Sequence, residues 1–231
     1  MKQNTQLCLV IILALISILI TVYHPISSQN QLLNPLLQSN LTRERIISQK
    51  DLSLANRQSD KWVNNIFKEN ILLNLAYLRG LVSSPKIDWD KVKQPFTFEF
   101  KLEPKQTFAF HGDIDDKYDG KVALTTNAHF NYQEGFKTGG YLFGDGVCHL
   151  ASIINWVAKE AGLLVEAPTR HDFAPIPDIP KEYGVSIYDA PGAKSSNAKQ
   201  NLYITNNHPK PITIRFNYQN DQLKVAVVEL N

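Results

Sequence analysis

A glycine-bent turn, a helix and a strand follow one another in residues 144–166, GDGVCHLASIINWVAKEAGLLVE. Apolar residues recur with helical spacing from Val147 to about Ala161, and Gly162 is typical of a residue that ends a helix. The next residues, LLVEAP, indicate a strand. The buried face of the helix is predicted to contain Val147, Leu150, Ala151, Ile154, Ala158 and Ala161.

Apolar spacing elsewhere in the chain sets the fold class. It predicts a second helix from about Asp60, with Ser59 as its cap and Gly80 at its end. Alternating apolar residues predict strands at residues 96–102, 184–189, 201–207, 211–218 and 223–230, with the C-terminal strands forming an antiparallel meander. We therefore expect an α+β domain over residues 60–231, with two main helices and an antiparallel sheet.

The N-terminal region contains an apolar run, residues 7–23, LCLVIILALISILITVY, without a charged residue. Roughly 17 to 25 such residues span a membrane as a helix. Lys2 precedes the run, which favours a cytoplasmic N-terminus of residues 1–6. We expect an uncleaved signal-anchor followed by a juxtamembrane stalk over residues 24–59, with a short helix near residues 41–50. A removed signal peptide is the alternative, and either arrangement places the domain outside the cytoplasm.

The charge of the chain excludes one class of partner. The formal net charge is +2, and no basic block exceeds two residues. Nucleic-acid-binding domains usually concentrate lysine and arginine on one face. We therefore expect no nucleic-acid partner, and a membrane contact only through the N-terminal helix.

Cys148 lies where the glycine-bent turn enters the predicted helix. The positive end of a helix lowers the pKa of a thiol, and a cysteine nucleophile also needs an imidazole base. His171 is the candidate base and Asp189 the candidate orienting carboxylate, so the predicted catalytic residues are Cys148, His171 and Asp189. The alternative is that Cys148 packs as a small buried residue and that His171 is a structural hydrogen-bonding residue.

A more polar stripe beside the apolar face of the helix could line a cleft. Cys148, Ser152 and Asn155 share this stripe, although Ser152 and Asn155 could equally bond the sheet behind them. We predict substrate-binding roles for His149, Ser152, Asn155, Tyr141 and Asp145. His149 is expected at the surface or cleft rim. The aromatic residues before Cys148 could bind sugars or peptides, or pack in the core.

Metal and cofactor sites are not predicted. The chain has no Cys-x-x-Cys or His-x-x-x-His spacing that would indicate zinc. The acidic turn HGDIDDKYDG, residues 111–120, lacks the glutamate that completes a calcium loop. We expect no metal and no cofactor.

The stretch around Cys148 resembles the VanW-like family, whose core motif runs Gly-Gly-Gly-hydrophobic-Cys-Gln and continues to Ala-Gly-Leu. Matching residues are Gly144, Gly146, Cys148, Ser152, Asn155, Ala161, Gly162, Leu163 and His171. Asp145, His149, Thr169, Asp172 and Pro191 depart from the family pattern. The resemblance covers residues 60–228 and implies an exported, envelope-associated bacterial domain without supplying a reaction.

Three functional hypotheses follow. The first is a membrane-anchored envelope protein that binds or modifies cell-wall glycan or peptide through a cleft at Cys148. If it is an enzyme, it is a thiol-dependent acyl transferase or hydrolase. The second is a non-catalytic binding module with the same cleft. The third is an assembly module in which Cys148 packs or pairs between chains.

Overall fold

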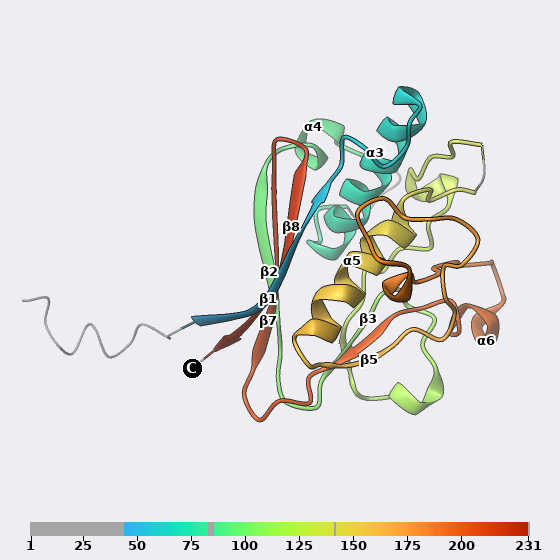
Figure 1. The fold of residues 1–231 in the computed structure, drawn as a ribbon. Helices are drawn as coiled ribbons and strands as arrows, with labels where there is room; N and C mark the ends of the chain where they lie inside the picture. The colour runs from blue at the N-terminus through green and yellow to red at the C-terminus, as the bar shows by residue number, and fades with distance from the viewer. Residues whose placement is uncertain (1–43, 83–85, 141, 231) are drawn as a thin grey trace, which may run out of the picture. The chain divides into compact units, whose positions relative to one another are not determined.

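The computed structural model describes residues 44–82, 86–140 and 142–230, which form two sheets and a set of helices (Figure 1). The predicted α+β class is confirmed. The elements in chain order are β1 (Glu44–Ser53), α3 (Lys61–Leu78), α4 (Trp89–Val92), β2 (Phe96–Leu102), β3 (Thr107–Ala109), η1 (Asp116–Tyr118), β4 (Val122–Leu124), η2 (Tyr132–Glu134), α5 (Val147–Glu160), β5 (Leu164–Glu166), η3 (Lys181–Tyr183), α6 (Lys194–Asn197), β6 (Tyr203–Thr205), β7 (Ile212–Gln219) and β8 (Gln222–Leu230).

Each sheet has four strands within the described residues, and the larger sheet is the one whose strands are 7 to 10 residues long. It is antiparallel, with strand order β1-β8-β7-β2. β7 and β8 form a hairpin whose two turn residues, Asn220 and Asp221, have φ of 51° and 57°. Asparagine and aspartate tolerate this left-handed region, which the tightest hairpin turns require. The turn therefore fixes the register in which Gln219 faces Gln222.

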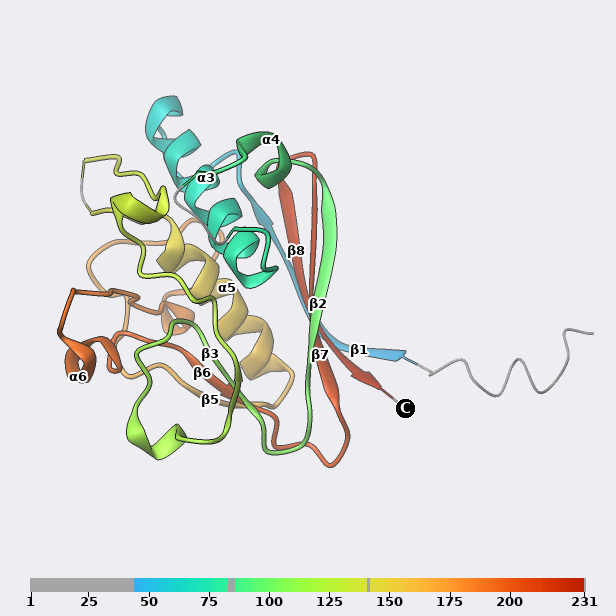
Figure 2. The same ribbon diagram turned by 180° about the vertical axis from the view of Figure 1, so that it is seen from behind.

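Helices α3 and α5 cover the same face of the larger sheet (Figure 2). α5 packs against β1 and β8, and α3 packs against α5. All six residues predicted for the buried face of α5 are buried, because helical periodicity places them toward the sheet. Asp60, and not Ser59, caps α3: its side chain accepts a hydrogen bond from the N–H of Val63.

The smaller sheet has strand order β4-β3-β6-β5. β6 pairs with β3 and β5, so the predicted single C-terminal meander is wrong and only β7 and β8 are hairpin neighbours. The strand predicted at residues 184–189 is reduced to one isolated antiparallel bridge between Val185 and Arg170. The N–H groups of Val185 and Ile187 donate to the side chains of Ser152 and Cys148 on α5 instead of to a neighbouring strand.

Residues 44–53, which the sequence placed in the stalk, form strand β1 of the larger sheet. The helix predicted near residues 41–50 is therefore wrong over its described part, because this segment completes a sheet edge along β8. No helix in the described part of the chain is both long and apolar enough to cross a membrane. The predicted signal-anchor, residues 7–23, lies outside the described residues.

Candidate functional site

A cleft of about 560 Å³ opens at the N-terminal end of α5. Loops from five parts of the chain form its walls, together with Phe67 of α3 and the first turn of α5. The cleft brings together five of the eight site residues predicted from the sequence, and His129 joins them. The histidine, aspartate and cysteine residues that line it are His129, Asp145, Cys148, His149, His171 and Asp189.

The turn before α5 depends on glycine. Gly146 has φ of 103°, and a Cβ atom there would lie 2.7 Å from the carbonyl oxygen of Phe67. Only glycine allows both this conformation and this approach to α3. Asp145 precedes Gly146 in the turn. Its carboxylate accepts a hydrogen bond of 2.6 Å from the N–H of Gly139 and so closes the loop between these two residues.

Cys148 is half-buried, and its sulfur contacts the backbone of Ile187. The N–H of Ile187 donates to the sulfur at 3.4 Å, and the thiol donates to the carbonyl of Ile187 at 3.6 Å. Burial raises the pKa of the thiol to about 11, and the charge of Asp145 adds to this increase. The expectation of a lowered pKa at the helix start is wrong, because desolvation of the thiolate outweighs the helix dipole.

His149 is buried and not at the rim, with 4% of its surface exposed. Its ring packs on Phe67, with centroids 5.1 Å apart, and its Nδ1 has no hydrogen-bond partner. Burial lowers the pKa of His149 to about 3, and the charges of Arg57 and His171 act in the same direction. His149 is therefore a neutral imidazole in the cleft wall at neutral pH.

His171 is also buried, and its ring lies edge-on to that of His149, with centroids 6.3 Å apart. Its Nδ1 lies 3.0 Å from the carbonyl of Ala174. A carbonyl can only accept, so Nδ1 carries the proton. No hydrogen bond joins Cys148 to a ring nitrogen within the described residues. The structure thus places Cys148 and His171 in one cleft without the contact that a thiol–imidazole pair requires.

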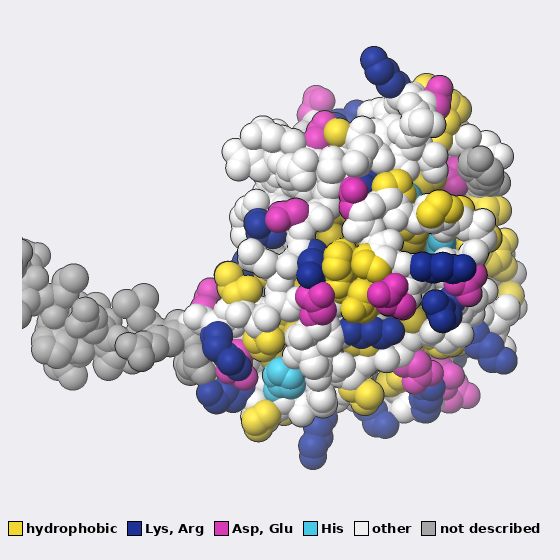
Figure 3. All heavy atoms as spheres, in the orientation of Figure 1, with side chains coloured by type: hydrophobic (Ala, Val, Ile, Leu, Met, Phe, Trp, Pro, Cys, Tyr) yellow, Lys and Arg dark blue, Asp and Glu magenta, His cyan; other side chains and the backbone are white. Residues whose placement is uncertain are grey.

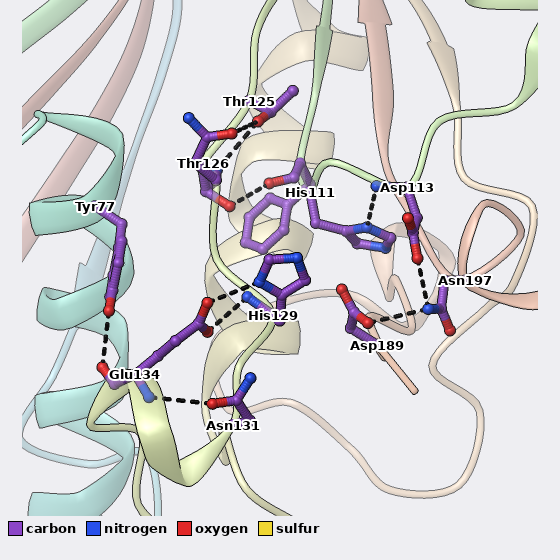
Figure 4. A network of polar contacts seen from close by, with 12 residues as sticks. Tyr77, His111, Asp113, Thr125, Thr126, His129, Asn131, Glu134, Asp189 and Asn197 are labelled. Atoms are coloured by element: carbon purple, nitrogen blue, oxygen red, sulfur yellow. Dashed lines mark hydrogen bonds and ion pairs between the residues drawn. The ribbon is translucent and has the colours of Figure 1, made fainter. Parts of the chain in front are cut away.

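A polar network that the sequence did not indicate lies on another side of the cleft (Figure 4). Nδ1 of His129 donates to Glu134 at 2.7 Å, and the N–H of His129 donates to the second oxygen of the same carboxylate, also at 2.7 Å. This hydrogen bond raises the pKa of His129, although partial burial opposes it. The imidazole is therefore held in one orientation at the cleft surface.

Asp189 faces His129, and its carboxylate points toward the imidazole ring (Figure 4). Nδ2 of Asn197 lies 3.0 Å from Asp189, 2.7 Å from Asp113 and 2.8 Å from the carbonyl of Ala190. Two amide hydrogens cannot satisfy three acceptors fully. Burial raises the pKa of Asp189, and the charge of Asp113 acts in the same direction, while His129 opposes it. The charges of Asp189 and His129 thus influence each other, and no hydrogen bond joins Asp189 to His171 within the described residues.

His129 and Glu134 could have been found by a local signal. Asn131 accepts a hydrogen bond from the N–H of Glu134, the arrangement of a cap residue with a glutamate three positions later. Glu134 then reaches back to His129. Phe130, between them, has φ of 56°, a conformation that costs a bulky residue about 1–3 kcal/mol and recurs near functional sites.

Two predicted binding residues lie beneath the cleft and do not line it. Ser152 is fully buried, donates to the carbonyl of Cys148 and accepts from the N–H of Val185. Asn155 is buried and donates to the carbonyl of Tyr183. Both side chains hold the segment 183–187 against α5. The alternative expected hydrogen bonds to the sheet behind the stripe, but the partners of Ser152 and Asn155 lie in α5 and this loop segment. Tyr141 lies outside the described residues.

Comparison with known protein families settles the relationship suggested by the Cys148 motif. Residues 99–228 match the family described as VanW like protein. The chain belongs to the VanW-like family. The matched residues run from β2 to β8 and include the whole of α5. Cys148 and the cleft residues near it therefore lie within the part of the chain that matches the family. No curated protein and no solved structure matched the chain.

Within the described part of this VanW-like chain, no group of three or more histidine, cysteine, aspartate or glutamate residues is arranged to hold a metal ion. The side chains that line the cleft supply several chemical groups. His129 offers an imidazole whose pKa is raised by its hydrogen bond to Glu134, His149 offers a neutral ring, and Cys148 offers a protonated thiol.

Proposed function

We propose that this VanW-like protein binds cell-wall material, glycan or peptide, in the cleft at the start of α5. In this proposal residues 7–23 anchor the chain in the membrane and residues 44–231 lie in the bacterial envelope. Cys148 has a structural role in the proposal: it fastens one wall of the cleft. The contact between its sulfur and Ile187 is the observation that carries this choice.

Binding is supported by the combination of surfaces in the cleft. Phe143, Phe173 and Tyr188 line it and are among the exposed large hydrophobic residues of the protein. Exposed aromatic side chains around a hollow are typical of ligand sites, because they supply apolar contact area with little loss of conformational entropy. His129 and Asp189 add polar groups that can orient a ligand.

Thiol catalysis has less support from the geometry. A nucleophilic thiol needs a lowered pKa and a base in hydrogen-bond reach. The pKa of Cys148 is raised to about 11, and the sulfur hydrogen bonds that the structure contains all involve the backbone of Ile187. These observations favour the binding module over the acyl transferase or hydrolase.

Co-sedimentation with purified peptidoglycan tests the proposal. The full-length chain in detergent is expected to pellet with the cell wall in a saturable way. Phe173→Ala removes an aromatic ring that is 75% exposed at the cleft, and it should weaken binding roughly tenfold, which corresponds to ~1.4 kcal/mol. Leu164→Ala is the control, because Leu164 is 60% exposed on β5 and does not line the cleft. Wild-type protein that stays in the supernatant would refute the proposal.

A further inference from the structure

Exposed hydrophobic side chains are concentrated around two adjoining hollows. Of the nine large hydrophobic residues exposed in the described part of the chain, six line the cleft or a second hollow of about 400 Å³ beside it. Figure 3 shows exposed hydrophobic side chains in several separate places on one face of the molecule. The six residues are Trp62, Tyr132, Leu142, Phe143, Phe173 and Tyr188.

Phe143 joins the two hollows, because it lines both of them. Its ring packs against that of Tyr132, with centroids 6.0 Å apart and planes inclined by 60°. Tyr132 is 72% exposed and Trp62, in the first turn of α3, is 67% exposed. Phe143 and Tyr132 thus carry an aromatic surface from the cleft into the second hollow, which Trp62 also lines. These three rings and the second hollow are here called the aromatic groove.

Polar groups accompany the aromatic rings of the groove. Glu69 lines it, has a side chain that is 4% exposed, and is bound at 2.5 Å by both Lys93 and Lys137. Nζ of Lys137 also lies 4.4 Å from the ring centroid of Trp89, which holds that ring in place at the groove wall. Asn65, exposed on α3, adds an amide to the lining. Both oxygens of the Glu69 carboxylate are therefore engaged, and the polar groups that the groove exposes are the amide of Asn65, which can donate and accept, and the ammonium of Lys137.

We infer that the aromatic groove is a saccharide subsite, so that a cell-wall glycan extends from the cleft across Phe143 and onto Tyr132 and Trp62. This inference rests on the proposed function and specifies its ligand. A pyranose ring has an apolar C–H face and a rim of hydroxyl groups. The C–H face is complementary to an aromatic ring, and the hydroxyl rim is complementary to the amide and ammonium groups of the groove. Continuity of the two hollows suits a polymer better than a small molecule.

Tryptophan fluorescence tests the subsite directly. Two of the three tryptophans, Trp62 and Trp89, line the groove, whereas Trp156 on α5 lines neither hollow. Titration of the full-length protein with a soluble N-acetylglucosamine oligomer should change the emission in a saturable way. Tyr132→Ala should raise the half-saturation concentration at least tenfold. Trp62→Phe should remove much of the signal, and Trp156→Phe should preserve the concentration dependence.

The controls separate this inference from the proposed function. If wild-type protein pellets with peptidoglycan, but the oligomer leaves the emission unchanged and Tyr132→Ala pellets like the wild type, the saccharide subsite is refuted alone. A saturable response to a sugar-free stem peptide, with none to the oligomer, would also overturn it. If the protein does not pellet with peptidoglycan at all, the proposed function fails first.

Discussion

The sulfur of Cys148 and the backbone of Ile187 exchange two hydrogen bonds, one in each direction, at 3.4 and 3.6 Å. The first turn of α5 is thereby fastened to the segment that carries Tyr188 and Asp189 into the cleft. A thiol engaged in this way supports the wall of a binding site and is poorly suited to attack a ligand.

The reactivity of Cys148 should be low near neutral pH. With a pKa of about 11, its thiolate fraction at pH 7 is expected to be about 100-fold smaller than that of an ordinary cysteine. Alkylation by iodoacetamide, followed by mass spectrometry on a Cys8→Ser background, measures the rate. The native protein should react far more slowly than the same protein in urea. Equal rates would show that the thiol is neither buried nor bonded.

Removal of the sulfur should weaken the contact between α5 and the 185–189 segment. Cys148→Ala leaves the N–H of Ile187 without its acceptor, and an unsatisfied buried donor costs about 1–3 kcal/mol. Cys148→Ser retains a donor and an acceptor and should lose less. Urea unfolding of the three proteins checks this order, and an alanine variant as stable as the wild type would contradict it.

Local patterns in the sequence predict much of the fold. Helix α5 could be located because apolar residues from Val147 to Ala161 keep one helical face and Gly162 follows them. The segment 184–189 has the alternation of a strand but is not one, because Ser152 and Cys148 provide partners for its N–H groups. No local pattern reveals that side chains 33 and 39 residues earlier in the chain will accept these hydrogen bonds and leave only a single bridge to Arg170.

The candidate site was predictable in its location but not in its pairings. The glycine turn at residues 144–146 lines the cleft, and its Gly146 lies against Phe67 of α3. The raised pKa of Cys148 was not predictable, because desolvation depends on how the loops close over the helix start. Asp189 faces His129 for the same reason: loops distant in the chain bring them together.

Gly146 should tolerate no side chain. Gly146→Ala combines a left-handed conformation with a Cβ atom 2.7 Å from the carbonyl of Phe67, and we expect a loss of about 3 kcal/mol or more in the free energy of unfolding. Gly80→Ala is the matched control, because φ there is 68° but no atom lies within 4 Å of the new Cβ. It should cost only about 1–2 kcal/mol. Similar losses for both variants would show that the close approach is unimportant.

The buried His149 should make stability depend on pH. Its pKa is about 3 in the folded protein and 6.5 in an unfolded chain, so the unfolded state binds the extra proton between these values. Above pH 6.5 the ring is neutral in both states, and its burial does not lower the free energy of unfolding. As the pH falls from 6.5 toward 3, protonation of the unfolded state lowers the free energy of unfolding by up to about 1.4 kcal/mol per pH unit. Unfolding free energies of the wild type and His149→Gln between pH 4 and 7 test this. The variant should show the shallower slope, and parallel curves would contradict a buried neutral ring.

The most direct test of the account is the binding of Cys148→Ser to purified peptidoglycan, measured by co-sedimentation beside the wild type and Phe173→Ala. A cleft that binds cell-wall material and uses Cys148 only as a structural contact predicts that Cys148→Ser binds within about twofold of the wild type, while Phe173→Ala binds markedly less. The account would be contradicted if the serine variant, folded and of native stability, lost binding while Phe173→Ala retained it.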